Sequence, residues 1–315
     1  MWDIEVDIAC IGSGVGALAN AIATVDAGGE VLVVDSSAPS RGDKSATALR
    51  ERVHAGRGWL VDDTRDIETN EYLAAVVEGV LDARASLSTY DIDGAVPLRD
   101  ARNLSTEEAH GPTAETFYGA RLNAWAAQCL TSPYGLLYSS MRDWRTTSMR
   151  SSSGESIEVT SIGEAPWGDG FGQADLRHWV TNQAQEREIE VRTSCALDRI
   201  VFEDGVIVGV VLSTPDGPCA VRTRAGLTLA PRVQDPMLDV HANSGADRPK
   251  QVCLVGRTAS RFGRVELLDT VPAAATRPIC TGSRRQFRAG MHDTRQPSLE
   301  GWRCGNVHGH PAFGQ

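Results

Sequence analysis

Residues 5–35 read EVDIACIGSGVGALANAIATVDAGGEVLVVD, and this stretch decides the fold. The apolar, β-branched run from Ile4 to Ile11 predicts a buried strand of a parallel sheet. Residues 12–17 then read G-x-G-x-x-A with an additional glycine before the alanine, and the alanine-rich run 18–27 predicts a helix. Residues 30–35 predict a second buried strand whose last residue is acidic.

This order of strand, glycine turn, helix, strand and acid predicts a dinucleotide-binding site. Gly12 permits the tight turn, Gly14 lets the backbone approach a pyrophosphate, and Ala17 allows close packing between helix and strand. The helix N-terminus offers N–H groups to the phosphates, and the terminal carboxylate is expected to accept hydrogen bonds from a ribose. The alternative is a βαβ unit whose glycines serve only packing. The predicted cofactor-binding residues here are Gly12, Ser13, Gly14, Val15, Gly16, Ala17 and Asp35.

The composition is that of a globular protein of one or two domains. The chain has 315 residues, of which 41% are hydrophobic and 23% charged. Its net charge of −10 argues against nucleic acid and anionic membranes as partners, and no segment is apolar enough for membrane insertion. We see no signal peptide, and seven cysteines without a C-x-x-C pair indicate reduced thiols. We therefore expect a cytoplasmic protein with a small-molecule substrate, and a redox partner protein or a homo-oligomer is compatible with the sequence.

Hydrophobic periodicity predicts the remaining elements. Helices are expected at about 63–81, 114–130 and 173–188, and a loop or short hairpin at 91–110. Strands at 189–193, 197–203, 206–213, 220–224 and 226–230 are separated in two places by the turn sequences Asp204-Gly205 and Pro215-Asp216-Gly217. In the tail, residues 251–256 predict a strand and 265–268 a short helix, whereas residues beyond Pro272 show little periodicity.

Candidate catalytic residues come from a stretch rich in arginine, tyrosine and hydroxyl groups, residues 132–158, and from the helix before it. Tyrosine and arginine side chains can orient a carbonyl or carboxylate substrate and move its protons. The alternative is a solvated connector with aromatic anchors. The catalytic candidates are Tyr134, Tyr138, Arg121 and Arg145. No metal site is expected, because Cys304, His308 and His310 lack a fourth ligand and element spacing.

The segments after Asp35 resemble a known family. The polar loop 36–48 can run along a long cofactor, and Arg41-Gly42, Ser45-Ala46-Thr47-Ala48-Leu49 and Gly56-Arg57-Gly58-Trp59 are similar to motifs of flavin-dependent oxidoreductases of the fumarate reductase and 3-ketosteroid Δ1-dehydrogenase type. The 189–230 pattern is similar to that family as well. The resemblance implies FAD as cofactor, with contacts from Ser36, Gly42, Ser45, Ala46 and the backbone of Leu197.

The resemblance implies an α/β fold: a Rossmann-like parallel sheet of the FAD-binding type with an inserted three-stranded antiparallel β-meander. The FAD-binding domain is expected at 1–62 and 171–231, with a helical and loop insertion at 63–170 and a partly irregular extension at 232–315. Pro231-Arg232-Val233 replaces the family's Thr-Gly-Gly, and the remaining chain is too short for the family's cap domain and C-terminal segment.

Three functions follow as alternatives. The first is an oxidoreductase that transfers hydride between flavin and an enone, steroid-like or dicarboxylate substrate. The second is an FAD-binding scaffold or partner-binding protein without activity, and the third is an NAD(P)-binding protein.

Overall fold

A computed structural model describes residues 1–35, 66–81, 96–110, 118–139, 146–168, 171–230 and 248–270. All of them belong to one unit, Met1–Thr276, and the second unit, Arg277–Gln315, lies outside them. Five predicted site residues also lie outside the described ranges, namely Ser36, Gly42, Ser45, Ala46 and Arg145. None of the helices in these ranges is long and apolar enough to cross a lipid bilayer.

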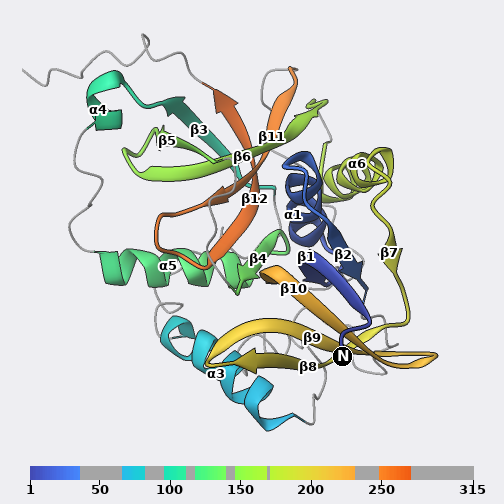
Figure 1. Ribbon diagram of the computed structural model, residues 1–315. Coiled ribbons are helices and arrows are strands. Elements are labelled where there is room, and N and C mark those ends of the chain that lie inside the picture. Colours follow the sequence, from blue (N-terminus) through green and yellow to red (C-terminus); the bar gives the residue numbers. More distant parts are fainter. Residues whose placement is uncertain are drawn as a thin grey trace, which may run out of the picture. The chain divides into compact units, whose positions relative to one another are not determined.

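Four strands pair in parallel in the order β10-β1-β2-β7 (Figure 1). The strands β1 and β2 and the helix α1 between them occur where the sequence predicts them, and α1 begins at the glycine turn. The bounds are β1 Ile4–Ile11, α1 Val15–Asp26, β2 Val31–Val34, β7 Val191–Arg192 and β10 Gly217–Leu229.

Two hairpins connect β8 (Ala196–Glu203), β9 (Val206–Thr214) and β10 in antiparallel pairs. Asp204 and Gly205 both have positive φ, 50° and 76°, which the first hairpin turn requires. The structure corrects the prediction of two strands at 220–224 and 226–230, because β10 is continuous and only shifts register beside β1. Helix α3 (Ile67–Leu81) packs on β8.

Five further strands form a closed ring, which the sequence does not predict. In this ring β11 pairs with β6, β6 with β5, β5 with β3, β3 with β12, and β12 again with β11 (Figure 1). We call it the barrel. Its strands are β3 Leu98–Asn103, β5 Thr147–Ser151, β6 Ser156–Ala165, β11 Lys250–Gly256 and β12 Phe262–Thr270.

Three sequence-based interpretations are wrong in the barrel. The predicted loop at 91–110 contains β3 and a short helix α4 (Thr106–His110), and the predicted connector at 132–158 contributes three strands. The predicted helix at 265–268 is part of β12. In β12 the charged residues Arg264 and Glu266 alternate with apolar ones, and Glu266 is buried in a pair with the distant Arg99 that local periodicity cannot reveal.

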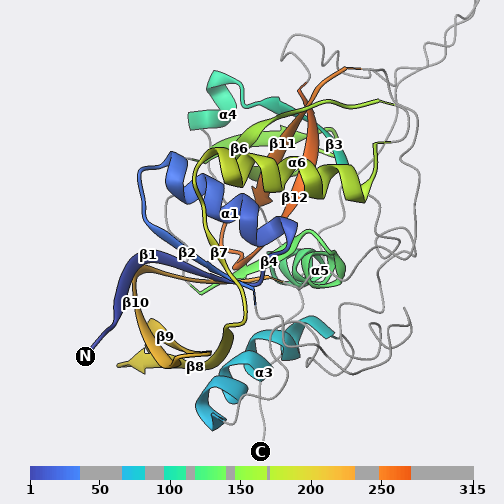
Figure 2. The same ribbon diagram turned by 90° about the vertical axis from the view of Figure 1, so that its right-hand side faces the viewer.

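Strand β4 joins the two parts of the sheet, because it pairs antiparallel with the end of β10 and with the start of β12. Helix α1 is buried from Val15 to Thr24 on all sides. One side packs on β1 and β2, other sides on β6, β11 and β12, and α6 runs beside it (Figure 2). Its apolar surface therefore belongs to both parts of the fold. The remaining bounds are α5 Tyr118–Thr131, β4 Gly135–Tyr138 and α6 Gln173–Glu186.

Candidate nucleotide-binding site

The glycine turn lies between the carboxyl ends of three strands. The amide of Gly12 donates to the carbonyl of Val34 at 2.8 Å, and Ala230 N donates to Ile11 O at 2.9 Å. Gly12 has φ +108°, and a Cβ there would lie 2.4 Å from the carbonyl oxygen of Ala230. Only glycine satisfies both the conformation and the close approach.

Packing explains the additional glycine of the motif. A Cβ on Gly16 would lie 2.7 Å from the carbonyl oxygen of Gly135 and 3.0 Å from that of Tyr134. The missing side chain at Gly16 therefore lets α1 approach β4, whereas its predicted contact with the cofactor stays a prediction. The sequence signal that could have revealed the partner was Tyr134-Gly135, a glycine at the start of an apolar run.

Gly14 differs from its neighbours in the turn. It is the N-cap residue of α1 with φ −69° and ψ 169°, an extended conformation that any residue adopts. The backbone angles at this position therefore do not require a glycine. No side chain caps the helix, and its first turn has no acidic residue. The amides of Val15, Gly16 and Ala17 precede the first helical hydrogen bond, Leu18 N to Gly14 O, so they are oriented towards an anion at this end.

Asp35 follows β2 directly and has an unsatisfied oxygen. Its amide donates to Arg192 O at 2.8 Å, which ties it to the end of β7. Its Oδ1 is buried and has no hydrogen-bond partner among the residues that the structure describes. A buried carboxylate oxygen without a donor is costly, so the position fits a ligand hydroxyl. The glycine turn and the amides at the start of α1 therefore fit a pyrophosphate, and Asp35 fits a ribose hydroxyl, as in a dinucleotide.

Leu197 follows shortly after β7 in the sequence, and the end of β7 binds Asp35. It is buried in β8 opposite Leu212, and only four residues separate it from Arg192, whose carbonyl accepts from Asp35. The predicted contact between its backbone and an adenine ring stays a prediction.

The structure brings two catalytic candidates to β4 and its start. Tyr134 is fully buried, and burial raises the pKa of its phenol. Tyr138 is half-buried, and burial raises its pKa well above the usual value, with the nearby thiols of Cys129 and Cys10 adding to the shift. Because β4 pairs with the end of β10, both tyrosines belong to the strand beside the glycine turn. Arg121 is exposed on α5.

Together, the turn, the uncapped helix and the acid define a nucleotide-binding α/β protein. The chain belongs to the FAD binding domain family, whose model matches residues 7–248. The resemblance seen in the sequence is thereby confirmed, and the cofactor of this family is FAD.

Solved structures with similarity to the chain include three flavoproteins. The 3-ketosteroid-Δ4-(5α)-dehydrogenase of Rhodococcus jostii RHA1 has 18% identity and a TM-score of 0.29, with 72% of this chain and 46% of that chain covered. A flavocytochrome c3 fumarate reductase has 12% identity, a TM-score of 0.29 and coverage of 71% and 33%. The 3-ketosteroid Δ1-dehydrogenase of Sterolibacterium denitrificans has 13% identity, a TM-score of 0.28 and coverage of 71% and 47%. The chain thus spans less than half the length of each. A search of the curated proteins found no match.

Proposed function

We propose that the chain is the FAD-binding part of an oxidoreductase that transfers hydride between flavin and a small organic substrate. The observation that carries this proposal is the unsatisfied Oδ1 of Asp35 at the end of β2, one strand from the uncapped N-terminus of α1. In this proposal β10-β1-β2-β7 with α1 forms a Rossmann-like unit, and β8, β9 and β10 form its meander. The domain division at 1–62 with 171–231, 63–170 and 232–315 is part of the same proposal.

The residues have separate tasks in holding FAD. Asp35 accepts from a ribose hydroxyl, and the amides at the start of α1 donate to the pyrophosphate. Ser13 and Gly14 line the approach, and the backbone of Leu197 borders the adenine. When bound, FAD supplies the two-electron chemistry, and the protein supplies orientation and proton handling.

Proton handling falls to β4 in this proposal. The raised pKa values of Tyr134 and Tyr138 keep both phenols protonated at neutral pH, so each has a proton to donate. A donor of this kind stabilises negative charge on a substrate oxygen. Arg121 and Arg145 are proposed to orient a carbonyl or carboxylate. An enone, a steroid-like ketone or a dicarboxylate would suit such groups.

One observation favours a second function, an FAD-binding scaffold without activity. Tyr134 is 0% exposed, so the structure does not present this residue to a substrate. In that case the chain would retain flavin and act through a partner protein or a second copy. We also retain the cytoplasm as the proposed compartment. Within the described ranges the cysteines 10, 129, 195, 219 and 253 are all free thiols.

Cofactor identity and turnover test the two functions in sequence. The purified protein is expected to carry the visible absorbance of oxidised flavin and to release FAD on heating. Anaerobic photoreduction followed by enones, 3-ketosteroids and dicarboxylates then measures reoxidation. Reoxidation by one class identifies the substrate, whereas flavin that none of them reoxidises supports the scaffold. A colourless protein that gains no stability from FAD contradicts both.

A further inference from the structure

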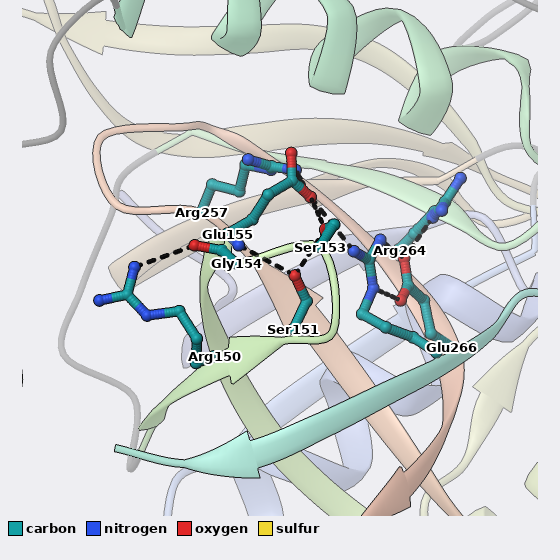
Figure 3. A network of polar contacts seen from close by, with 9 residues as sticks. Arg150, Ser151, Ser153, Gly154, Glu155, Arg257, Arg264 and Glu266 are labelled. Carbon is teal, nitrogen blue, oxygen red and sulfur yellow. Dashed lines mark hydrogen bonds and ion pairs between the residues drawn. The ribbon is translucent and has the colours of Figure 1, made fainter. Parts of the chain in front are cut away.

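Five charged side chains form a partly buried chain of ion pairs inside the barrel, in which only Glu266 is fully buried (Figure 3). Arg257 pairs with Glu155 at 2.7 Å, and Glu155 pairs with Arg99 at 3.4 Å. Arg99 binds Glu266 through two nitrogens at 2.6 and 3.0 Å, and Glu266 accepts from Arg264 at 2.6 Å. They come from β3, β12 and the turns between β5 and β6 and between β11 and β12.

Trp125 of α5 lies at both ends of this chain of ion pairs. The guanidinium carbons of Arg257 and Arg264 lie 5.1 and 5.2 Å from its ring centroid, within the range of cation–π contacts. The indole is fixed, because its Nε1 donates to Phe262 O at 2.8 Å and the residue is 1% exposed. The two arginine ends therefore face one rigid aromatic surface.

The charges of the network do not cancel. Three arginines face two glutamates, which leaves one excess positive charge. Burial opposes ionisation of Glu266, but the charges of Arg264 and Arg99 outweigh it, so the pKa of this carboxyl lies below its ordinary value. The pKa of Glu155 is likewise lowered by Arg257 and Arg99 against burial. Both carboxylates are ionised at neutral pH, and the excess charge stands.

The two arginines at the ends of the chain of ion pairs have N–H donors that are not used within the described part of the chain. Arg264 donates only through Nε, and its two terminal nitrogens have no acceptor within the described part of the chain. Arg257 Nε is buried without a hydrogen-bond partner, and each of the two side chains is 10% exposed. Among the described residues the Nε of Arg257 is a buried donor without an acceptor, which is costly, whereas the terminal nitrogens of Arg264 reach solvent and are accessible to an added anion.

This cluster is separate from the nucleotide site. Along β12, Val265 and Leu267 pack in the same core cluster as α1, whereas Phe262 and Leu268 pack in the other cluster with Trp125. Side chains alternate between the faces of a strand, so Arg264 and Glu266 point away from α1.

We propose that Arg264, Arg257 and Trp125 form a binding site for a small organic carboxylate. The planar guanidinium fork of Arg264 matches the two oxygens of a carboxylate, and the added negative charge balances the network. The indole of Trp125 holds the two guanidinium groups in place through its cation–π contacts, and its emission reports on their surroundings.

Anion titration tests this proposal with the protein in its FAD-loaded and FAD-free forms. Sodium benzoate and acetate are compared with sodium chloride and sodium sulfate at equal ionic strength, and thermal unfolding and tryptophan emission are recorded. We expect both carboxylates to raise the unfolding midpoint above the chloride value and to change the emission, in both forms, with sulfate weaker. Trp125→Phe is expected to abolish the emission change.

Two variants locate the response. Arg264→Met is expected to weaken carboxylate binding at least roughly 10-fold, because it removes the charged fork at similar length. Arg257→Met serves in its place if the first variant does not fold. Arg150→Met, on β5 outside the ion-pair chain, is the matched control and should bind as the parent does. Three results would each overturn the proposal: equal effects of carboxylate, sulfate and chloride, an unchanged response in both arginine variants, or loss of the response on FAD loading.

Discussion

Asp35 carries a buried oxygen that no donor in the described ranges satisfies, at the place where a ribose is expected. Asp35→Ala removes this oxygen. We expect FAD binding to weaken by about 1–3 kcal/mol, roughly 10- to 100-fold, while the FAD-free protein keeps or gains thermal stability. Fluorescence titration with FAD and thermal unfolding measure the two effects. The exposed Glu190→Ala before β7 is the control, and equal FAD affinity in both variants would contradict the assignment.

Gly12 combines a positive φ with a backbone contact that cannot give way. Gly12→Ala adds strain of about 1–3 kcal/mol and a Cβ that would lie 2.4 Å from a carbonyl oxygen, and we expect the loss of stability to exceed the strain alone. Gly28→Ala separates the two causes, because Gly28 also has positive φ, +83°, but nothing lies within 4 Å of its Cβ position. Urea unfolding of both variants gives the comparison. A loss no larger at Gly12 than at Gly28 would refute the packing role.

A buried side chain of helix α3 makes hydrogen bonds to β8 and to the start of the helix. Thr69 is fully buried, and its hydroxyl oxygen accepts from Ile200 N at 2.8 Å and donates to Asp66 at 2.6 Å. Thr69→Val leaves the Ile200 amide without an acceptor, which costs about 1–3 kcal/mol in the free energy of unfolding. Thr69→Ser keeps the hydroxyl and should cost clearly less by urea unfolding. A loss in Thr69→Val no larger than that in Thr69→Ser would contradict the role of the hydroxyl.

Local elements were predictable because their signals are local. The segment β1-α1-β2 carries its glycines, its alanines and its acid within 31 residues, and the hairpin turn Asp204-Gly205 carries its own dipeptide. The strands of the barrel give no such signal. Glu266 reads as a polar residue in a short helix, and only its pairing with Arg99, far away in the chain, permits a buried strand there. The site was likewise predictable at the turn, whereas the role of Gly135 depends on a tertiary contact.

At the scale of the whole molecule, stability is expected to depend on the charges inside the barrel. Glu266→Gln leaves Arg99 and Arg264 without their shared carboxylate, and breaking a buried pair in this way costs about 3–5 kcal/mol. Chemical unfolding at neutral pH measures the loss. Glu108→Gln, at a more exposed pair with Arg102, is the control with a much smaller expected effect. A loss no larger than that of the control would contradict the structural role of the network.

The same carboxylate predicts the response to acid. The pKa of Glu266 is lowered in the folded protein, so its contribution is complete above the pKa of the unfolded chain, 4.5, and is lost as the pH falls through the lower folded value. Stability should therefore decline below about pH 4.5 in the parent and decline less steeply in Glu266→Gln. Unfolding curves from neutral to acid pH check this slope. If stability falls equally steeply with pH in the parent and in Glu266→Gln, other carboxyl groups determine the loss of stability in acid.

Helix α1 is covered on one side by β1 and β2 and on others by β6, β11 and β12. During synthesis the first covering strands emerge within 34 residues, but the last described strand ends at Thr270. Until the later strands are synthesised, such an exposed apolar surface can bind chaperones and other chains. The nascent protein therefore carries a partly exposed apolar helix until β6, β11 and β12 have been synthesised, and these strands also form part of the barrel.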